Sequence, residues 1–85
     1  MINEKEDSMN RELIEKRIEA RPDIQHGKPC IKGTRVPVYA VLEALAMGLT
    51  PEKTVKEYAP LTLEDVRACV LYAALLANEQ EVVAA

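Results

Sequence analysis

Apolar and polar residues at the start of the chain follow two different periods. From Met9 to Ile18 the apolar positions recur every four or five residues, which predicts a short N-terminal helix over about 9–16. Residues 18–21 then alternate between apolar and charged side chains, which predicts a short strand that ends at Pro22.

The segment 23–37 is irregular. Gly27 and Gly33 stand six positions apart, with a proline between them, and predict two turns around a short extended piece at 30–32. We therefore place short strands within residues 18–36.

The rest of the chain predicts three closely spaced helices, because apolar runs alternate with capping signals. The first follows a helix-entrance proline and ends before a C-terminal glycine, the second follows a Thr-Pro cap, and the third starts with a capping box. These helices are expected over 38–47, 51–58 and 63–77. Six residues are assigned structural roles in the turns and caps: Gly27, Gly33, Pro37, Gly48, Thr62 and Asp65.

This order predicts a mainly α, single-domain protein over residues 9–78. Three consecutive helices with short connections outline a helix-turn-helix of the three-helix homeodomain-like kind, preceded by short strands and an N-terminal helix. A flexible acidic arm at 1–8 and a short C-terminal tail at 79–85 are expected to flank it.

Composition adds an expectation about assembly. The 85 residues are 48% apolar, yet contain no Trp and no Phe, and a chain of this size has little interior. The stretch 38–47 contains one charged residue and 68–77 contains none, so each needs cover on all sides. We therefore predict a homodimer, with a monomer exposing a few alanines as the alternative. The expected interface residues are Ala68, Leu71, Tyr72, Ala74 and Leu75.

The chemistry of the side chains does not indicate an enzyme. Cys30 and Cys69 lie among apolar neighbours without a metal-ligand spacing, which predicts buried, reduced thiols in a cytoplasmic protein, with no metal and no cofactor. No nucleophile–base pattern or phosphate-binding glycine motif is present. The longest apolar run has ten residues, too short to span a membrane, and the first residues do not resemble a secretory signal.

The net charge is −3, but residues 11–35 contain seven basic and four acidic side chains. This stretch supplies the candidate DNA-binding residues: Arg17, Arg21, Lys28, Lys32, Thr34 and Arg35. Arg35 has a structural alternative, which is an ion pair with Asp65 or Glu57. The acidic residues Glu64 and Asp65 at the start of the third helix disfavour that helix as the DNA reader.

Several motifs resemble one known family. They include His26-Gly27-Lys28-Pro29, Lys32-Gly33-Thr34-Arg35-Val36-Pro37-Val38, Gly48-Leu49-Thr50-Pro51-Glu52 and Leu61-Thr62-Leu63-Glu64-Asp65-Val66. Residues 18–77 resemble the domain of unknown function 433 family, and the resemblance implies a small, mostly helical, homeodomain-like fold. It further implies a VapB-type antitoxin of a type II toxin–antitoxin pair, which binds a PIN-like ribonuclease toxin and represses its own operon through promoter DNA.

Two hypotheses follow. The first is a dimeric antitoxin-like protein with autoregulatory DNA binding, and the second is a dimeric protein-interaction module without DNA affinity. The C-terminal eight residues contain no Arg or Lys, so we expect the toxin to contact the folded surface or the N-terminal helix.

Overall fold

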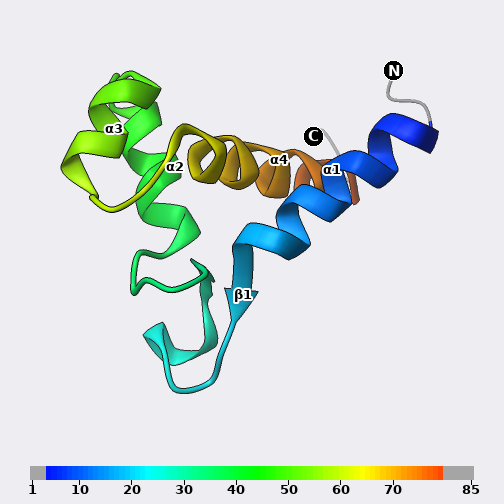
Figure 1. Cartoon of the computed structure of the whole chain (residues 1–85), viewed down its shortest axis with the longest axis horizontal. Coiled ribbons are helices and arrows are strands. Elements are labelled where there is room, and N and C mark those ends of the chain that lie inside the picture. The colour runs from blue at the N-terminus through cyan, green and yellow to red at the C-terminus, as the bar shows by residue number, and fades with distance from the viewer. Residues whose placement is uncertain (1–3, 80–85) are drawn as a thin grey trace, which may run out of the picture.

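The computed structural model describes residues 4–79, which form four α-helices and a two-stranded sheet. The mainly helical fold class predicted from the sequence is thereby confirmed. In chain order the elements are α1 (Glu4–Arg17), β1 (Ile18–Ala20), the 3-10 turn η1 (Gln25–Gly27), β2 (Pro29–Ile31), α2 (Val38–Ala46), α3 (Pro51–Glu57) and α4 (Leu63–Glu79) (Figure 1).

Helix α1 starts at Glu4, five residues before the predicted helix. Residues 4–8, which we assigned to a flexible arm, therefore belong to the helix, while residues 1–3 of that arm lie outside the described residues. Apolar periodicity begins only at Met9, but the preceding residues include no glycine or proline and are compatible with a helix. Helix α4 extends to Glu79, and the rest of the predicted tail lies outside the described residues.

The two strands pair antiparallel, with Ile18 opposite Ile31, and both isoleucines are buried. The chain after β2 then folds back on itself, because the amide of Ile31 donates to the carbonyl of Val36 at 3.0 Å and Cys30 forms an isolated bridge with Pro37. The predicted extended piece is thus present, one residue earlier in the chain. This small sheet fixes where α1 enters the domain and where α2 begins.

Helix α2 begins after Pro37, whose backbone is extended, and ends at a left-handed glycine. Gly48 has φ +100°, and the amide of Leu49 donates to the carbonyl of Ala44 at 3.0 Å. A positive φ is unstrained for glycine, and this hydrogen bond satisfies a carbonyl in the last turn of the helix. Gly27 and Gly33 also have positive φ, as turn residues at these positions require.

Side chains cap the next two helices as their sequences predict. The hydroxyl of Thr50 accepts from the amide of Lys53 at 3.1 Å and starts α3. At α4, the hydroxyl of Thr62 accepts from the amide of Asp65 at 3.2 Å, and the Asp65 carboxylate accepts from the amide of Thr62 at 2.9 Å. Because both bonds are made, the capping box holds the Asp65 carboxylate at the start of α4.

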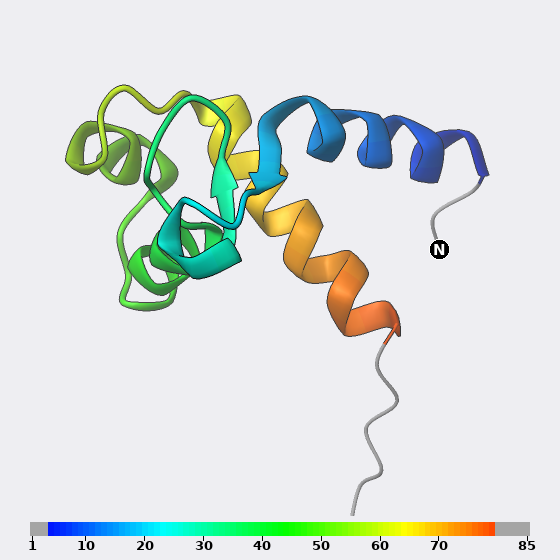
Figure 2. The same cartoon turned by 90° about the horizontal axis from the view of Figure 1, so that it is seen from below.

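Helices α2, α3 and α4 pack against one another, and α1 packs on α4. The buried core is mainly aliphatic and comprises Ile18, Ile31, Val38, Val41, Leu61, Val66, Ala68 and Cys69. Figure 2 shows that α1 and α4 approach each other beside β1 and then diverge, so their far ends extend away from the other elements. The C-terminal half of α4 therefore has neighbours on fewer sides than its first half.

Candidate functional site

Arg17, a predicted DNA-binding residue, is an internal ion-pair partner. Its guanidinium donates to Glu64 Oε2 at 2.7 Å and to Asp65 Oδ1 at 3.2 Å, and it lies 3.4 Å from the hydroxyl of Thr62. The Asp65 side chain is only 9% exposed. Arg17 thus links the end of α1 to the start of α4, and two carboxylates offset its charge.

Arg35 does not make the ion pair with Asp65 or Glu57 that we considered from sequence. The guanidinium on Asp65 belongs to Arg17, and across residues 8–79 Arg35 makes no ion pair. Its backbone carbonyl instead accepts from Gln25 Nε2 at 3.0 Å. Arg17 takes the place predicted for Arg35 because α1 ends beside the first turn of α4. No local sequence pattern encodes this proximity.

The remaining DNA-binding candidates are divided among several places. Arg21 pairs with its neighbour Asp23 at 3.0 Å, and the Thr34 hydroxyl donates to the carbonyl of Ile31 at 2.8 Å within a turn. Lys28 lies over the ring of Tyr39, with Nζ 4.8 Å from the ring centre. Only Lys32 shares a site with Arg17.

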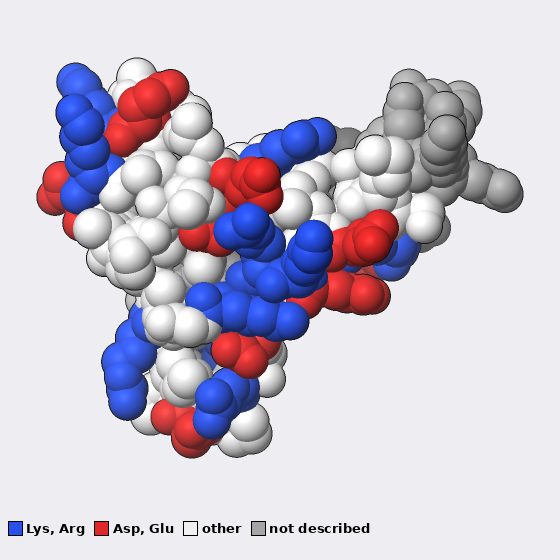
Figure 3. Space-filling model, in the orientation of Figure 1, with Lys and Arg blue, Asp and Glu red and all other residues white. Residues whose placement is uncertain are grey.

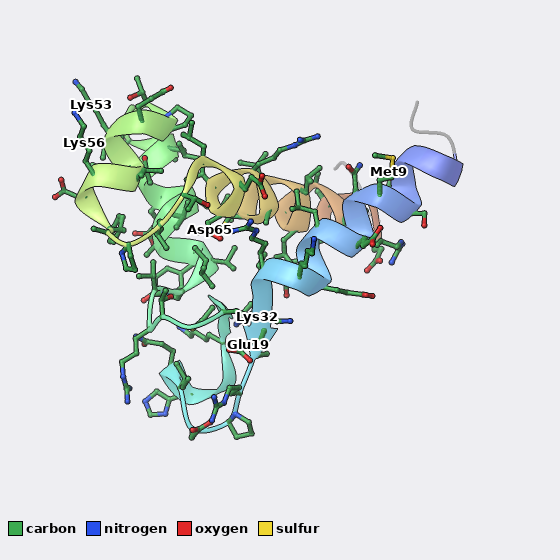
Figure 4. All side chains as sticks on the ribbon, in the orientation of Figure 1. Met9, Glu19, Lys32, Lys53, Lys56 and Asp65 are labelled. Carbon is green, nitrogen blue, oxygen red and sulfur yellow. The ribbon has the colours of Figure 1, made fainter. Side chains whose placement is uncertain are left out.

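That shared site is a hollow of about 200 Å³ lined by Lys16, Arg17, Lys32 and Asp65. Figure 3 shows basic side chains gathered where α1 meets β1, with acidic side chains immediately beside them. Lys53 and Lys56 project from α3, well away from Lys32 (Figure 4). The basic surface is therefore broken into small groups interrupted by acids.

The predicted dimer interface on α4 needs one correction. Ala68 is fully buried in the core of its own chain, so it is not available to a partner. Position 68 faces inward because it lies beside Cys69 on the side of α4 that packs on the core. Tyr72 and Leu75 are half-buried, as is Leu71, and Ala74 is exposed.

Two apolar grooves flank the C-terminal half of α4. The α2–α4 groove has a volume of about 530 Å³ and is lined by Lys28, Pro29, Val38, Tyr39, Leu42, Tyr72, Ala73, Leu76 and Ala77. The α1–α4 groove has a volume of about 230 Å³ and is lined by Arg11, Ile14, Glu15, Tyr72, Leu75, Leu76 and Glu79. Because Tyr72 and Leu76 line both grooves, one apolar surface continues from α2 across α4 to α1.

Most residues of the α2–α4 groove were not singled out from the sequence, which indicates Lys28 only as a DNA-binding candidate and Tyr72 only as a dimer-interface residue. The sequence does contain a signal for this groove, which is the low charge of the stretch 38–47. A helix with a single charged residue has more apolar surface than one packing face can bury. In the structure Tyr39 is 47% exposed and Leu76 is 42% exposed, although both are large apolar side chains. Exposed apolar side chains gathered in a groove mark a candidate binding surface.

A third groove of about 650 Å³ lies between α2 and α3. Its walls include Ala40, Ala44, Leu49 and Tyr58, and Met47, which is 82% exposed, lies at its edge. Its rim contains both acidic and basic residues, namely Glu43, Lys53, Lys56 and Glu57.

Both cysteines are buried free thiols, as predicted. Burial, with the carboxylate of Asp65 as a second cause, raises the pKa of the Cys69 thiol to about 12. Burial, with Glu19 as the second cause, also raises the pKa of Cys30. Both thiols are therefore protonated at neutral pH, which makes them poor nucleophiles and poor metal ligands.

The described part of the chain contains neither a metal-type cluster nor a membrane-spanning helix. Among the side chains of residues 8–79, no three His, Cys, Asp or Glu are grouped as a metal site would require. Within the same part of the chain, every helix is too short or too polar to span a bilayer.

Comparisons with known proteins agree with the fold. A crystal structure of a DUF433 member protein from Anabaena variabilis ATCC 29413 superimposes with a TM-score of 0.69 at 22% sequence identity, covering 92% of this chain and 80% of that one. The uncharacterized protein y4eO of Sinorhizobium fredii (strain NBRC 101917 / NGR234) is 38% identical over 56 residues. These residues are 66% of this chain, which spans about a quarter of the length of that relative.

The family model described as protein of unknown function (DUF433) matches residues 18–73. The matched segment contains β1, β2, α2, α3 and more than half of α4, and with them most of the α2–α4 groove. Since the match extends over more than half of the sequence, this chain belongs to the DUF433 family.

Proposed function

We propose that this protein is a non-catalytic, antitoxin-like binding protein that acts in the cytoplasm and blocks a PIN-like ribonuclease toxin by direct contact. The observation that supports it most is the continuous apolar surface on α2, α4 and α1, with Tyr39 and Leu76 nearly half-exposed. A surface of this kind is stable in water when another polypeptide covers it. The resemblance of the His26–Val38 and Gly48–Val66 motifs to the family supports the choice of an antitoxin.

The proposal includes a homodimer formed through the C-terminal half of α4. The predicted residues Leu71, Tyr72, Ala74 and Leu75 retain exposed surface there, while Ala68 does not. A stable dimer of this kind buries about 800 Å² per copy. The size of the particle in solution, measured by light scattering or sedimentation, tests this part.

A second activity, repression of its own operon, is the DNA-binding part of the proposal. The order of α2, α3 and α4, with short connections, supports a homeodomain-like helix-turn-helix. Across residues 8–79, Lys28, Lys32 and Arg35 contact no carboxylate at ion-pair distance and are the candidates to contact phosphates.

One observation favours the alternative of a dimeric interaction module without DNA binding. Arg17 and Arg21, two of the six DNA-binding candidates, are engaged by Glu64, Asp65 and Asp23. A guanidinium already paired with a carboxylate gains less from a phosphate. DNA binding therefore depends on fewer cations than the sequence suggests.

Two experiments separate these functions. Co-expression of the chain with a PIN-like nuclease encoded beside it should relieve the toxicity of the nuclease and yield a co-purified complex. A nuclease that remains toxic beside abundant chain contradicts the antitoxin role. An electrophoretic shift on the upstream promoter DNA at two salt concentrations tests repression: salt-sensitive binding that is lost in Lys32→Ala/Arg35→Ala supports it, and absence of a shift leaves the interaction module.

A further inference from the structure

The three apolar grooves differ in the charges at their rims. The α1–α4 groove contains Arg11, Glu15 and Glu79, and the α2–α3 groove contains two lysines and two glutamates. The α2–α4 groove contains one charged residue, Lys28, and no acid. Of these three grooves, it alone presents charge of a single sign.

Lys28 is held at the edge of the α2–α4 groove. Its Nζ lies 4.8 Å from the centre of the Tyr39 ring, a cation–π distance, and Tyr39 is itself a wall of the groove. Across residues 8–79, Lys28 lies within ion-pair distance of no carboxylate. The ring contacts one side of the ammonium, so the remaining N–H donors are available to an acceptor above the groove.

The walls of this groove suit an inserted helix. One wall is α2, with Tyr39 and Leu42, and the other is α4, with Tyr72 and Leu76. Ala73 and Ala77 are small, and in an α-helix residues four apart share a face, so a helix lying in the groove can approach the α4 backbone closely. Such helix-in-groove binding inserts the apolar face of an amphipathic helix.

The charge at the rim argues against a second copy of this chain as the occupant. A twofold axis through the groove would place the same groove opposite itself, so two Lys28 side chains would meet with no acid on either face. Like charges brought together across an interface oppose binding. The α1–α4 groove has both signs, which a twofold mate can complement, so the dimer of the proposed function fits that side of α4.

We propose that the α2–α4 groove binds an amphipathic helix of a different protein, with a carboxylate of that helix paired to Lys28. The proposal rests on the proposed function, which identifies the partner as the toxin. The recognition chemistry is a pair of apolar side chains about one turn apart, between Tyr39 and Leu76, followed by an Asp or Glu beside Lys28.

A pair of small probes tests the chemistry of the groove without any partner protein. In an NMR titration of the full chain, 4-phenylbutyrate should perturb the signals of Tyr39, Leu42, Leu76 and Ala77, and it should bind about fivefold more tightly than 4-phenylbutylamine. Lys28→Glu should reverse this preference, and Lys56→Glu, an exposed lysine on α3, should leave it unchanged. Equal binding of the two probes, or perturbations outside the groove only, would overturn the assignment.

The complex with the co-encoded nuclease tests the identity of the occupant. Ala77→Glu, which lies in this groove and not in the α1–α4 groove, and Lys28→Glu should each weaken nuclease binding at least tenfold, while Leu63→Glu, at a 53% exposed leucine outside the groove, should not. If wild-type chain binds the nuclease and the two groove variants bind it equally well, the groove assignment is wrong and the antitoxin function stands. If wild-type chain does not bind the nuclease, the proposed function fails, and the two small probes decide the assignment of the groove.

Discussion

The guanidinium of Arg17 lies 3.2 Å from the carboxylate of Asp65, although the two residues are 48 positions apart in sequence. Asp65 at the same time accepts from the amide of Thr62 at 2.9 Å, so one carboxylate both caps α4 and holds the end of α1. The backbone of Arg17 takes part as well, because its carbonyl accepts from the amide of Lys32 at 2.8 Å. Helix α1, the residue after β2, and α4 are therefore joined at one point.

Removing the Arg17 side chain should destabilise the fold. Arg17→Ala leaves the nearly buried Asp65 carboxylate without its cation, and the expected loss is about 1–2 kcal/mol because Arg17 is itself partly exposed. Thermal or urea unfolding measures this loss. Arg21→Ala, which removes an exposed ion pair with Asp23, is the matched control and should cost less than about 0.5 kcal/mol. Equal losses in the two variants would show that the Arg17–Asp65 pair contributes no more to stability than the exposed Arg21–Asp23 pair.

A negative charge on the outer face of α4 should dissociate the proposed dimer. Ala74 is exposed in the single chain, so Ala74→Glu should leave the helix intact and place an unpaired charge in the apolar interface. Light scattering should then give the mass of a single chain, accompanied by lower solubility. Lys53→Glu makes a larger change in charge, of two units, on α3 and away from α4, and this variant should remain dimeric. A dimer that survives Ala74→Glu at full stability would place the interface elsewhere.

The raised pKa of the Cys69 thiol predicts that the folded chain loses stability at high pH. Its pKa is raised to about 12 in the folded chain from an ordinary value of 9.0, chiefly by burial and then by Asp65. Below about pH 9 the thiol is protonated in both states and makes no difference. Between about 9 and 12 the unfolded chain releases the proton and the folded chain retains it, so the free energy of unfolding falls as pH rises.

The measurement is chemical unfolding at several pH values between 8 and 11. Cys69→Ala lowers stability at every pH by removing a buried side chain, but its slope against pH should be shallower than that of the wild type. Cys30→Ala provides a second comparison, because burial raises the pKa of that thiol too. A slope that is unchanged in Cys69→Ala would contradict the assignment to this thiol.

Replacing Gly48 should cost stability through the backbone alone. A Cβ at this position would meet no atom within 4 Å, but φ +100° is strained for any residue that has one. Gly48→Ala should therefore lower the free energy of unfolding by about 1–2 kcal/mol. Gly48→Asn should recover part of the loss, since asparagine tolerates left-handed backbone better. An alanine variant as stable as the wild type would show that the turn relaxes to negative φ.

Local features of this chain could be read from its sequence because each depends on residues three or four apart. The caps at Thr50 and Thr62, the turn at Gly48 and the approximate positions of α2, α3 and α4 all belong to this group. The sequence predicts the start of α1 five residues late, because the first turns of this helix lack an apolar stripe. The buried thiols followed from their apolar neighbours.

The candidate site could be predicted only in part. The low charge of the stretches 38–47 and 68–77 is visible in the sequence, and it predicts apolar surface on α2 and α4. Whether Ala68 or Ala74 faces outward depends on how α4 rotates against the core, and the structure buries Ala68. The pairing of Arg17, rather than Arg35, with Asp65 depends on the path of α1.

The sequence by itself determined the approximate positions of α2, α3 and α4, which turns need glycine, and that α2 and α4 have few charged residues. Hydrogen bonds and steric limits within a few residues set these features, so they are already present in the local order of side chains. Only the tertiary structure decided that Arg17 meets Asp65 and that Lys28 lies over Tyr39 at the rim of an apolar groove. The packing of distant elements sets these contacts. Each groove is lined by side chains from several elements, so its charge depends on that packing and not on any one stretch of sequence.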